Sequence, residues 1–172
     1  MRYFSLVVIF FAVVFQLSAM PNLQIDTSKY VLLDYSKNLR VSEFPYSSKA
    51  TTLSLKEIEQ IELIIKKAAA KYNKQQIEFT NSRSDDKKVR NWLYNPIKNP
   101  ESYFKQFIAV IAPNGHKLVW INCIKDKEFL LKQGTDLRKA PCIVMDGGSN
   151  YFNLQIDITN GTVIFFRVNG NA

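Results

Sequence analysis

The chain contains 172 residues and carries 23 Lys and Arg against 15 Asp and Glu, a formal net charge of +8. This length fits one ordinary globular domain and excludes an array of several domains. The positive charge can attract anionic partners such as lipid headgroups, acidic glycans or nucleic acid, but it does not specify a fold.

Residues 1–19 have the layout of a secretory signal peptide. Arg2 precedes a continuous apolar run, and small residues close the segment. Gln16 interrupts the run well before the ~20 apolar residues that a transmembrane helix needs. We therefore expect cleavage after about Ala19. Residues 20–172 should form a single mature domain without a transmembrane segment, in the periplasm or outside the cell.

The first half of the mature chain predicts an arm and one helix. Residues 20–50 contain one apolar cluster among turn-forming residues, which predicts an arm with a short strand. Residues 52–75 predict a helix that begins with a capping box, because Ser54 and Glu57 have the S-x-x-E spacing. Its expected buried stripe consists of Leu55, Ile58, Ile61, Ile64, Ile65, Ala68 and Tyr72.

Residues 79–103 predict a connecting segment, since they contain two Asn-Pro pairs and no sustained period. Trp92 and Tyr94 are the exceptions within it. Aromatic side chains in a connection either fold back onto the core or contact a partner. Both residues are therefore candidates for a binding surface.

From residue 103 onward the sequence predicts strands. Residues 103–112 and 116–124 flank Pro113-Asn114-Gly115, and Asn-Gly between β-rich runs indicates a hairpin. The longer connection at 125–141 predicts one helical turn over residues 127–133. Residues 142–145 then predict another short strand.

Asp146-Gly147-Gly148-Ser149-Asn150 follows that expected strand. The stretch has neither spacing of the phosphate-binding glycine loops, and no helix follows it to offer backbone amides to an anion. We interpret it as a hairpin turn between two strands, in which Gly147 and Gly148 adopt the unusual dihedral angles of a tight reversal. Ser149, Asn150 and Tyr151 form a second candidate binding surface at this corner.

The last two strands are expected at 151–158 and 162–168. In the first, apolar and polar residues alternate, so one face should be buried and the other exposed to water. The expected buried residues are Phe152, Leu154, Ile156 and Ile158, and the expected exposed residues are Tyr151, Asn153, Gln155 and Asp157.

Cys123 and Cys142 are the two cysteines of the chain. In an exported protein, an even number of cysteines favours a disulfide, and closing this loop would contribute about 3 kcal/mol in the chain-entropy model. A redox pair is the competing interpretation, although such pairs usually have the Cys-x-x-Cys spacing. We predict a structural Cys123–Cys142 disulfide.

One helix followed by four or five strands with tight turns predicts an α+β fold, in which an N-terminal helix packs on a four- to five-stranded antiparallel sheet. Cystatin-like domains share this plan, which is a resemblance of architecture alone. The Gln-x-Val-x-Gly loop of cystatin-type protease inhibitors is absent, because residues 106–110 are Gln-Phe-Ile-Ala-Val. Protease inhibition is therefore not implied.

The sequence predicts no catalytic residue, metal site or cofactor. His116 is the only histidine and has no second ligand at metal spacing, so we interpret it as a solvated turn residue. Glu128, Asp146 and Asp157 are isolated acids. They leave open an enzyme that lines its sheet and helix with carboxylates.

Three segments resemble small exported proteins of unknown function from Bacteroidetes-type bacteria. They are the helix LSLKEIEQIELIIKKAAAKYN, the hairpin SYFKQFIAVIAPNGHKLVWINC and the C-terminal CIVMDGGSNYFNLQIDITNGTVIFFRVNGNA. The resemblance implies a diderm bacterial envelope or a secreted location. It supplies no catalytic residues that could be transferred.

These observations favour a non-enzymatic exported module that binds an unknown protein, peptide or glycan through one sheet face or through residues 79–103. Two alternatives remain: a small hydrolase-type enzyme that uses the isolated acids, and a structural envelope component recruited by charge to an anionic surface. A nucleic-acid partner is disfavoured, because exported proteins rarely meet one.

Overall fold

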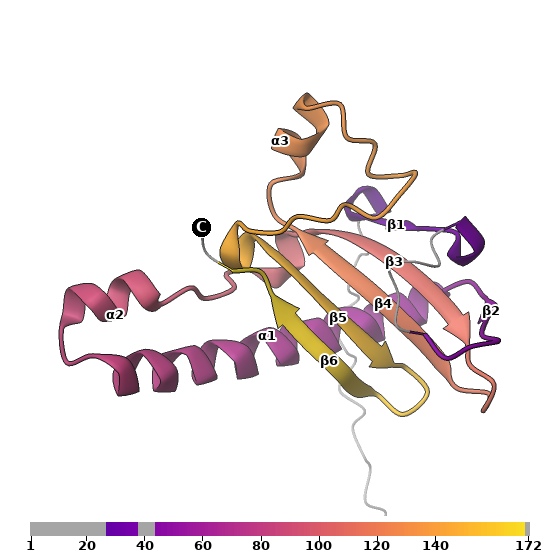
Figure 1. Ribbon diagram of the computed structural model, residues 1–172. Helices are drawn as coiled ribbons and strands as arrows, with labels where there is room; N and C mark the ends of the chain where they lie inside the picture. Colours follow the sequence, from indigo (N-terminus) through magenta and orange to yellow (C-terminus); the bar gives the residue numbers. More distant parts are fainter. Residues whose placement is uncertain (1–26, 38–43, 171–172) are drawn as a thin grey trace, which may run out of the picture.

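The computed structural model describes residues 27–37 and 44–170. These residues form an α+β fold in which one long helix, α1, lies across a six-stranded sheet (Figure 1). The signal segment expected at residues 1–19 lies outside the described residues. Among the residues that are described, no helix has the length and apolarity to cross a membrane.

The strands are β1 (Tyr30–Leu32), β2 (Lys49–Ala50), β3 (Phe104–Ile111), β4 (Lys117–Ile124), β5 (Tyr151–Asp157) and β6 (Thr162–Val168). The α-helices are α1 (Leu55–Arg83), α2 (Lys87–Leu93) and α3 (Lys127–Lys132). Four short 3-10 helices complete the fold: η1 (Thr27–Lys29), η2 (Tyr35–Lys37), η3 (Pro100–Ser102) and η4 (Gly148–Asn150).

The sheet is mixed, which corrects the expectation of a wholly antiparallel one. Strands β3 to β6 form the predicted antiparallel meander. β1 pairs in parallel with one end of β3, where Tyr30 lies opposite Lys105, and β2 pairs antiparallel with the other end. Two short strands thus precede α1, so the helix is not N-terminal. Strands of two and three residues are too short to show an alternating pattern in the sequence.

Helix α1 begins at the predicted capping box. The backbone N–H of Ser54 donates to the Glu57 carboxylate at 2.7 Å, and the backbone N–H of Glu57 donates to the Ser54 hydroxyl at 3.3 Å. Leu55 does not join the buried stripe, because it lies in the first turn and is 61% exposed. Ile58, Ile61, Ile65 and Ala69 are buried instead.

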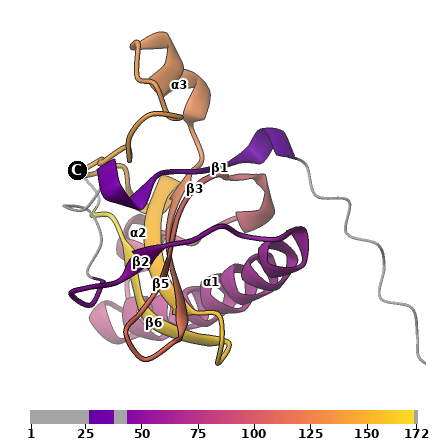
Figure 2. The ribbon, with the colours of Figure 1, turned by 90° about the vertical axis from the view of Figure 1, so that its right-hand side faces the viewer.

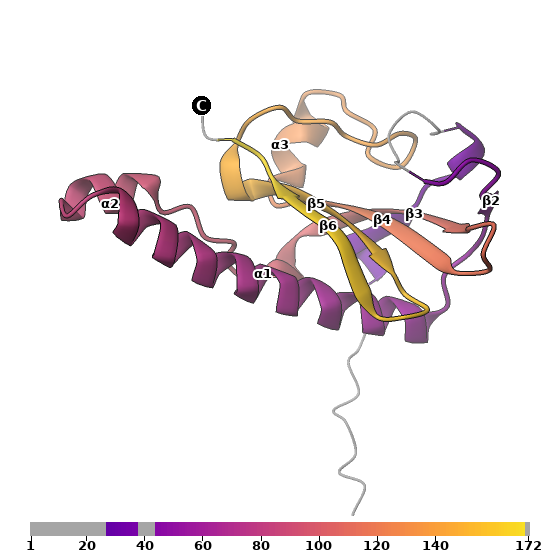
Figure 3. The same ribbon diagram turned by 60° about the horizontal axis from the view of Figure 1, so that its bottom comes forward.

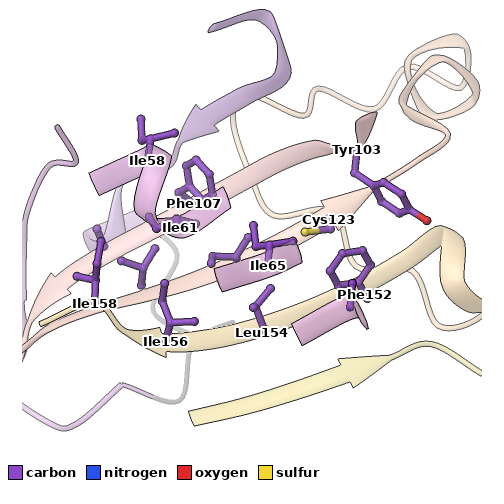
Figure 4. Close-up of a cluster of buried hydrophobic side chains, with 14 of the residues drawn as sticks. Ile58, Ile61, Ile65, Tyr103, Phe107, Cys123, Phe152, Leu154, Ile156 and Ile158 are labelled. Atoms are coloured by element: carbon purple, nitrogen blue, oxygen red, sulfur yellow. The ribbon is translucent and has the colours of Figure 1, made fainter. Parts of the chain in front are cut away.

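The main core lies between α1 and one face of the sheet, and Figure 3 shows the helix below the strands. Each buried isoleucine of α1 contributes about 1.5–3 kcal/mol relative to its exposed state. Figure 4 shows side chains from the helix and from three strands converging there. Phe107 comes from β3, Cys123 from β4, and Phe152, Leu154 and Ile156 from β5.

The core also contains a charged pair. Lys105 projects from β3 toward α1, its side chain is 1% exposed, and its Nζ lies 3.0 Å from a carboxylate oxygen of Glu62. Lys105 Nζ also donates to the carbonyl of Tyr103 at 3.1 Å. Burial raises the pKa of Glu62, against the opposing attraction of Lys105. The cost of removing two charges from water offsets much of their attraction, so such a pair adds little net stability.

The second face of the sheet is also covered, which contradicts the expectation of an exposed polar row on β5. Tyr151, Gln155 and Asp157 are all buried. The segment after β1 packs there, with Leu33 against Ile108 and Trp120 and with the rings of Tyr35 and Phe44 beside them. Figure 2 views the sheet close to its edge, with α1 on one side.

Residues 79–103 are more ordered than a simple connection. Helix α1 continues to Arg83, and α2 folds back beside its end (Figure 1). The segment after α2 is held against α1 by the side-chain amide of Asn73. This amide donates to the carbonyl of Ile97 and accepts from its N–H, each at 2.8 Å. Ile97 is 2% exposed and joins the main core.

Candidate functional site

A cleft of 740 Å³ lies between α3 and the segment that leads into β5; we call it the α3 cleft. Figure 1 shows α3 and this segment rising beyond one end of the sheet. The cleft is lined by Asp126, Phe129, Leu130, Gln133, Thr135, Pro141, Cys142, Ile143, Val144, Asp146, Gly147, Asn150 and Tyr151. It thus includes two of the three residues predicted at the glycine-rich corner.

The wall that carries Cys142 is held by buried side-chain amides of the sheet. Gln106 Nε2 donates to the carbonyls of Leu137 and Ala140 at 2.7 and 2.8 Å. Gln106 Oε1 accepts from the backbone N–H of Cys142 at 2.8 Å and from Asn122 Nδ2 at 3.0 Å. Asn122 Nδ2 in turn donates to the carbonyl of Cys142 at 2.7 Å. These bonds satisfy polar groups that burial would otherwise leave unpaired.

The other end of the same wall is held by the chain that follows β6. Asn169 Nδ2 donates to the carbonyls of Val144 and Asp146. The N–H of Gly148 donates to the carbonyl of Gly170 at 2.9 Å. The wall of the α3 cleft is therefore fastened at both ends, although it contains no strand.

Residues 142–145 are thus not the short strand that the sequence predicts, and the glycine-rich stretch is not a hairpin turn. The stretch forms the short helix η4 before β5. The expectation of unusual glycine dihedral angles is confirmed, with φ of 92° at Gly147 and 57° at Gly148. A Cβ on Gly147 would lie 2.7 Å from the Tyr151 ring, so Gly147 also sets where that ring sits.

The predicted Cys123–Cys142 disulfide is absent, and both cysteines are free. Cys123 projects into the core beneath α1, where it is 0% exposed (Figure 4). Cys142 packs against Phe104 and Ile124 on the opposite face. The sheet therefore separates the two thiols. Burial raises the pKa of each, so both remain protonated thiols rather than nucleophilic thiolates.

Two carboxylates line the α3 cleft together with the phenol of Tyr151. Burial raises the pKa of Tyr151, and the charges of Asp126 and Asp146 raise it further. No Lys or Arg is among the described residues that line the cleft. On a chain with a net charge of +8, the cleft is thus locally acidic.

Two apolar side chains of the lining are largely exposed. Phe129 is 57% exposed and Ile143 67%. Scattered apolar residues are ordinary on a protein surface, whereas a group within one polar cleft indicates a binding site.

The remaining candidate residues lie apart from the cleft or take structural roles. Ser149 accepts a hydrogen bond from the buried Tyr103 hydroxyl through its backbone carbonyl, at 2.9 Å. Tyr94 is exposed at the end of α2, which lies well away from α3 (Figure 1). The backbone of Trp92 is in α2, and its side chain lies outside the described residues. The structure therefore does not join Trp92 and Tyr94 with the glycine-rich corner.

The three isolated acids do not converge either. Asp146 lines the α3 cleft, whereas the Glu128 side chain is 74% exposed on α3 outside it. Asp157 lies at the far end of β5, where it accepts from His116 Nδ1 at 2.7 Å and from Asn160 Nδ2 at 2.8 Å. The histidine expected to be solvated thus links two turns of the sheet.

Sequence reasoning missed the residues that build the cleft. Gln106, Asn122 and Asn169 lie in or beside strands and have no motif spacing, and their partners are distant in the chain. The sequence feature that could have revealed them is an amide side chain within an otherwise apolar strand, because a buried amide needs hydrogen-bond partners. No group of His, Cys, Asp and Glu able to hold a metal ion occurs among the described residues. Comparison with family models, curated proteins and solved structures finds no match to this chain.

Proposed function

We propose that the protein is an exported, non-enzymatic binding module whose α3 cleft holds a cationic group attached to an apolar body. A lysine or arginine side chain flanked by apolar residues of a peptide or protein has this chemistry. The observation that carries the proposal is that Asp126 and Asp146 line one cleft with Tyr151 and that no described lining residue is basic.

Three physical features support this assignment. A guanidinium can donate to carboxylates and also stack on an aromatic ring, and the cleft offers both kinds of group. The exposed Phe129 and Ile143 can cover the body of the ligand. The wall is fastened by Gln106, Asn122 and Asn169, so binding would require little ordering of the protein.

The α3 cleft is a better candidate for the binding surface than either face of the sheet. Helix α1 covers one face, and the segment around Leu33 covers much of the other. A protonated thiol at Cys142 and the distance of His116 from the cleft also leave the cleft without a nucleophile and base in contact. Binding is therefore the function that these residues support.

The test uses the peptide acetyl-Phe-Arg-Phe-amide and its citrulline counterpart, which has the same shape without the charge. Titration calorimetry should show the arginine peptide binding about tenfold tighter, because only it pairs with the carboxylates. NMR shifts should change at Tyr151 and at the two aspartates. Binding should weaken as salt concentration rises.

The double variant Asp126→Asn and Asp146→Asn should abolish this preference. Asp126 makes no side-chain cap bond at α3, so the asparagine leaves the helix intact. The matched control is Asp85→Asn with Asp86→Asn, two exposed acids before α2, where asparagine preserves the cap. Equal binding of the two peptides, or equal loss in both double variants, would contradict the proposal.

Export is a separate part of the proposal and has its own test. Mass spectrometry of the protein recovered from outside the cytoplasm should find a chain that begins near residue 20. Recovery of the intact residues 1–19 on a cytoplasmic protein would contradict export and leave the cleft proposal standing.

A further inference from the structure

Strand β6 forms one edge of the sheet. The strand order is β1-β3-β4-β5-β6, and within the described residues β6 pairs with β5 alone. An edge strand presents a row of backbone N–H and C=O groups that another strand can pair with. Edges are usually blunted by charge or proline, whereas β6 reads TVIFFRV with Arg167 as its one charged residue.

A groove of 500 Å³ runs between this edge and helix α1; we call it the α1–β6 groove. Its strand side is formed by residues 161 and 163–166, where Val163 is 41% exposed and Ile164 52%. Figure 3 shows α1 passing beneath β6 at an angle to the strand. The helix therefore leaves the apolar edge accessible instead of sealing it.

The helix side of the groove adds two positive charges. Lys67 and Lys71 lie one turn apart on α1 and line the groove with Ile64, Ala68 and Tyr72. No Asp or Glu is among the described lining residues. The groove thus combines an apolar floor, a strand edge and two ammonium groups.

We propose that β6 accepts an additional strand from a partner polypeptide whose groove-facing side chains, at every second position, include both apolar and acidic residues. The added backbone would pair with β6, as in other strand-addition complexes. Its apolar side chains would cover Val163, Ile164 and Phe166. Its carboxylates would lie near Lys67 and Lys71.

Charge favours this partner over a second copy of the chain. Two copies joined symmetrically through β6 would place their α1 helices on the same face of one continuous sheet. Lys67 and Lys71 of both copies would then face the same groove, and like charges brought together in this way oppose association. An acidic strand neutralises these ammonium groups instead.

The probe is a fluorescein-labelled peptide, Val-Thr-Glu-Thr-Val-Thr-Glu-Thr-Val, in which valine and glutamate share one face of the strand, and its binding is followed by fluorescence anisotropy. In the first control peptide, lysine replaces each glutamate. In the second, alternate backbone nitrogens are methylated. We expect the acidic peptide to bind at least about tenfold tighter than either control, because the first loses the charge pairing and the second loses the strand pairing.

The protein variants separate the groove from general electrostatics. Lys67→Glu with Lys71→Glu should weaken acidic-peptide binding at least about tenfold. Lys66→Glu with Lys74→Glu changes the charge of the same helix equally at exposed residues outside the groove lining, and should change binding less than about twofold. Asp126→Asn with Asp146→Asn should leave this binding unchanged, since the inference does not rest on the α3 cleft.

Several outcomes would overturn the inference. Equal binding of the N-methylated peptide would mean that the backbone of β6 is not used and that the groove takes an amphiphile. If both double lysine variants weakened peptide binding equally, the binding would depend on the overall charge of the protein and not on the groove. Sedimentation velocity that shows a dimer of the unliganded protein, lost on Ile164→Lys, would identify a second copy as the occupant.

Discussion

Asp157 and His116 lie together because the sheet brings the two turns that carry them to the same end. The two residues are 41 positions apart, and Asn160 completes the group. Burial alone would raise the pKa of Asp157, but the hydrogen bonds from His116 and Asn160 outweigh it and lower that pKa below 3.8. The pair therefore stabilises the folded state through an ionised carboxylate.

The lowered pKa of Asp157 predicts that the stability of the protein depends on pH. A carboxyl whose pKa is lowered by folding stabilises the protein above its unfolded pKa, and that contribution is lost as pH falls through the folded pKa. Asp157→Asn should thus lower the free energy of unfolding by about 1 kcal/mol at neutral pH. The difference from the parent should shrink below pH 3.8.

Urea denaturation at a series of pH values measures this difference. Asp85→Asn serves as the control, since Asp85 is exposed before α2. An aspartate carboxyl is largely protonated at about pH 2. A stability difference that stays constant down to that pH would show that Asp157 does not act through its charge.

At the scale of elements, the segment from Leu137 to Cys142 depends on one side chain. Gln106 bonds to the carbonyls of Leu137 and Ala140 and to the N–H of Cys142. Gln106→Leu should leave these groups unpaired and lower the free energy of unfolding by about 1–3 kcal/mol. The wall of the α3 cleft should also open more often.

Thiol labelling under native conditions detects this opening. In the parent, Cys142 should react slowly and Cys123 only on unfolding, because Cys123 is 0% exposed in the core. Gln106→Leu should accelerate the labelling of Cys142 and leave that of Cys123 unchanged. Gln76→Leu on α1 is the matched control. Two thiols should be found on denaturation without reductant; finding none would restore the disulfide and contradict the structure.

Element types were largely predictable, whereas their boundaries and partners were not. The helix at 52–75 and the hairpin around Asn114-Gly115 carry strong local signals, a capping box with a 3.6-residue period and a turn that needs positive φ. β1 lies in the apolar cluster that predicted a short strand within residues 20–50, whereas β2, which has only two exposed residues, carries almost no signal. Residues 142–145 have the composition of a strand, but they pair with no described strand, and Cys142 and Val144 instead pack on side chains of the sheet.

At the scale of the whole molecule, stability depends on covering both faces of the sheet. Leu33 is 4% exposed and packs with Ile108 and Trp120 on the face opposite α1. Leu33→Ala should lower the free energy of unfolding by about 2–5 kcal/mol, since it removes apolar contact and leaves a cavity.

The matched control is Leu63→Ala on α1, where the leucine is 51% exposed. That change should stay within about 0.5 kcal/mol in thermal or chemical denaturation. Similar losses in the two variants would show that the segment after β1 does not contribute to the core.

The sequence by itself determined the α+β class, the main helix, the antiparallel meander and the row of β5 residues that faces α1. These follow from local periodicity and turn chemistry, which depend on neighbouring residues. Tertiary structure alone decided that the two cysteines lie on opposite faces of the sheet, that His116 contacts Asp157, and that Asp126 and Asp146 line one cleft with Tyr151. Such contacts join residues far apart in the chain, so they depend on strand order and register, which no local pattern encodes.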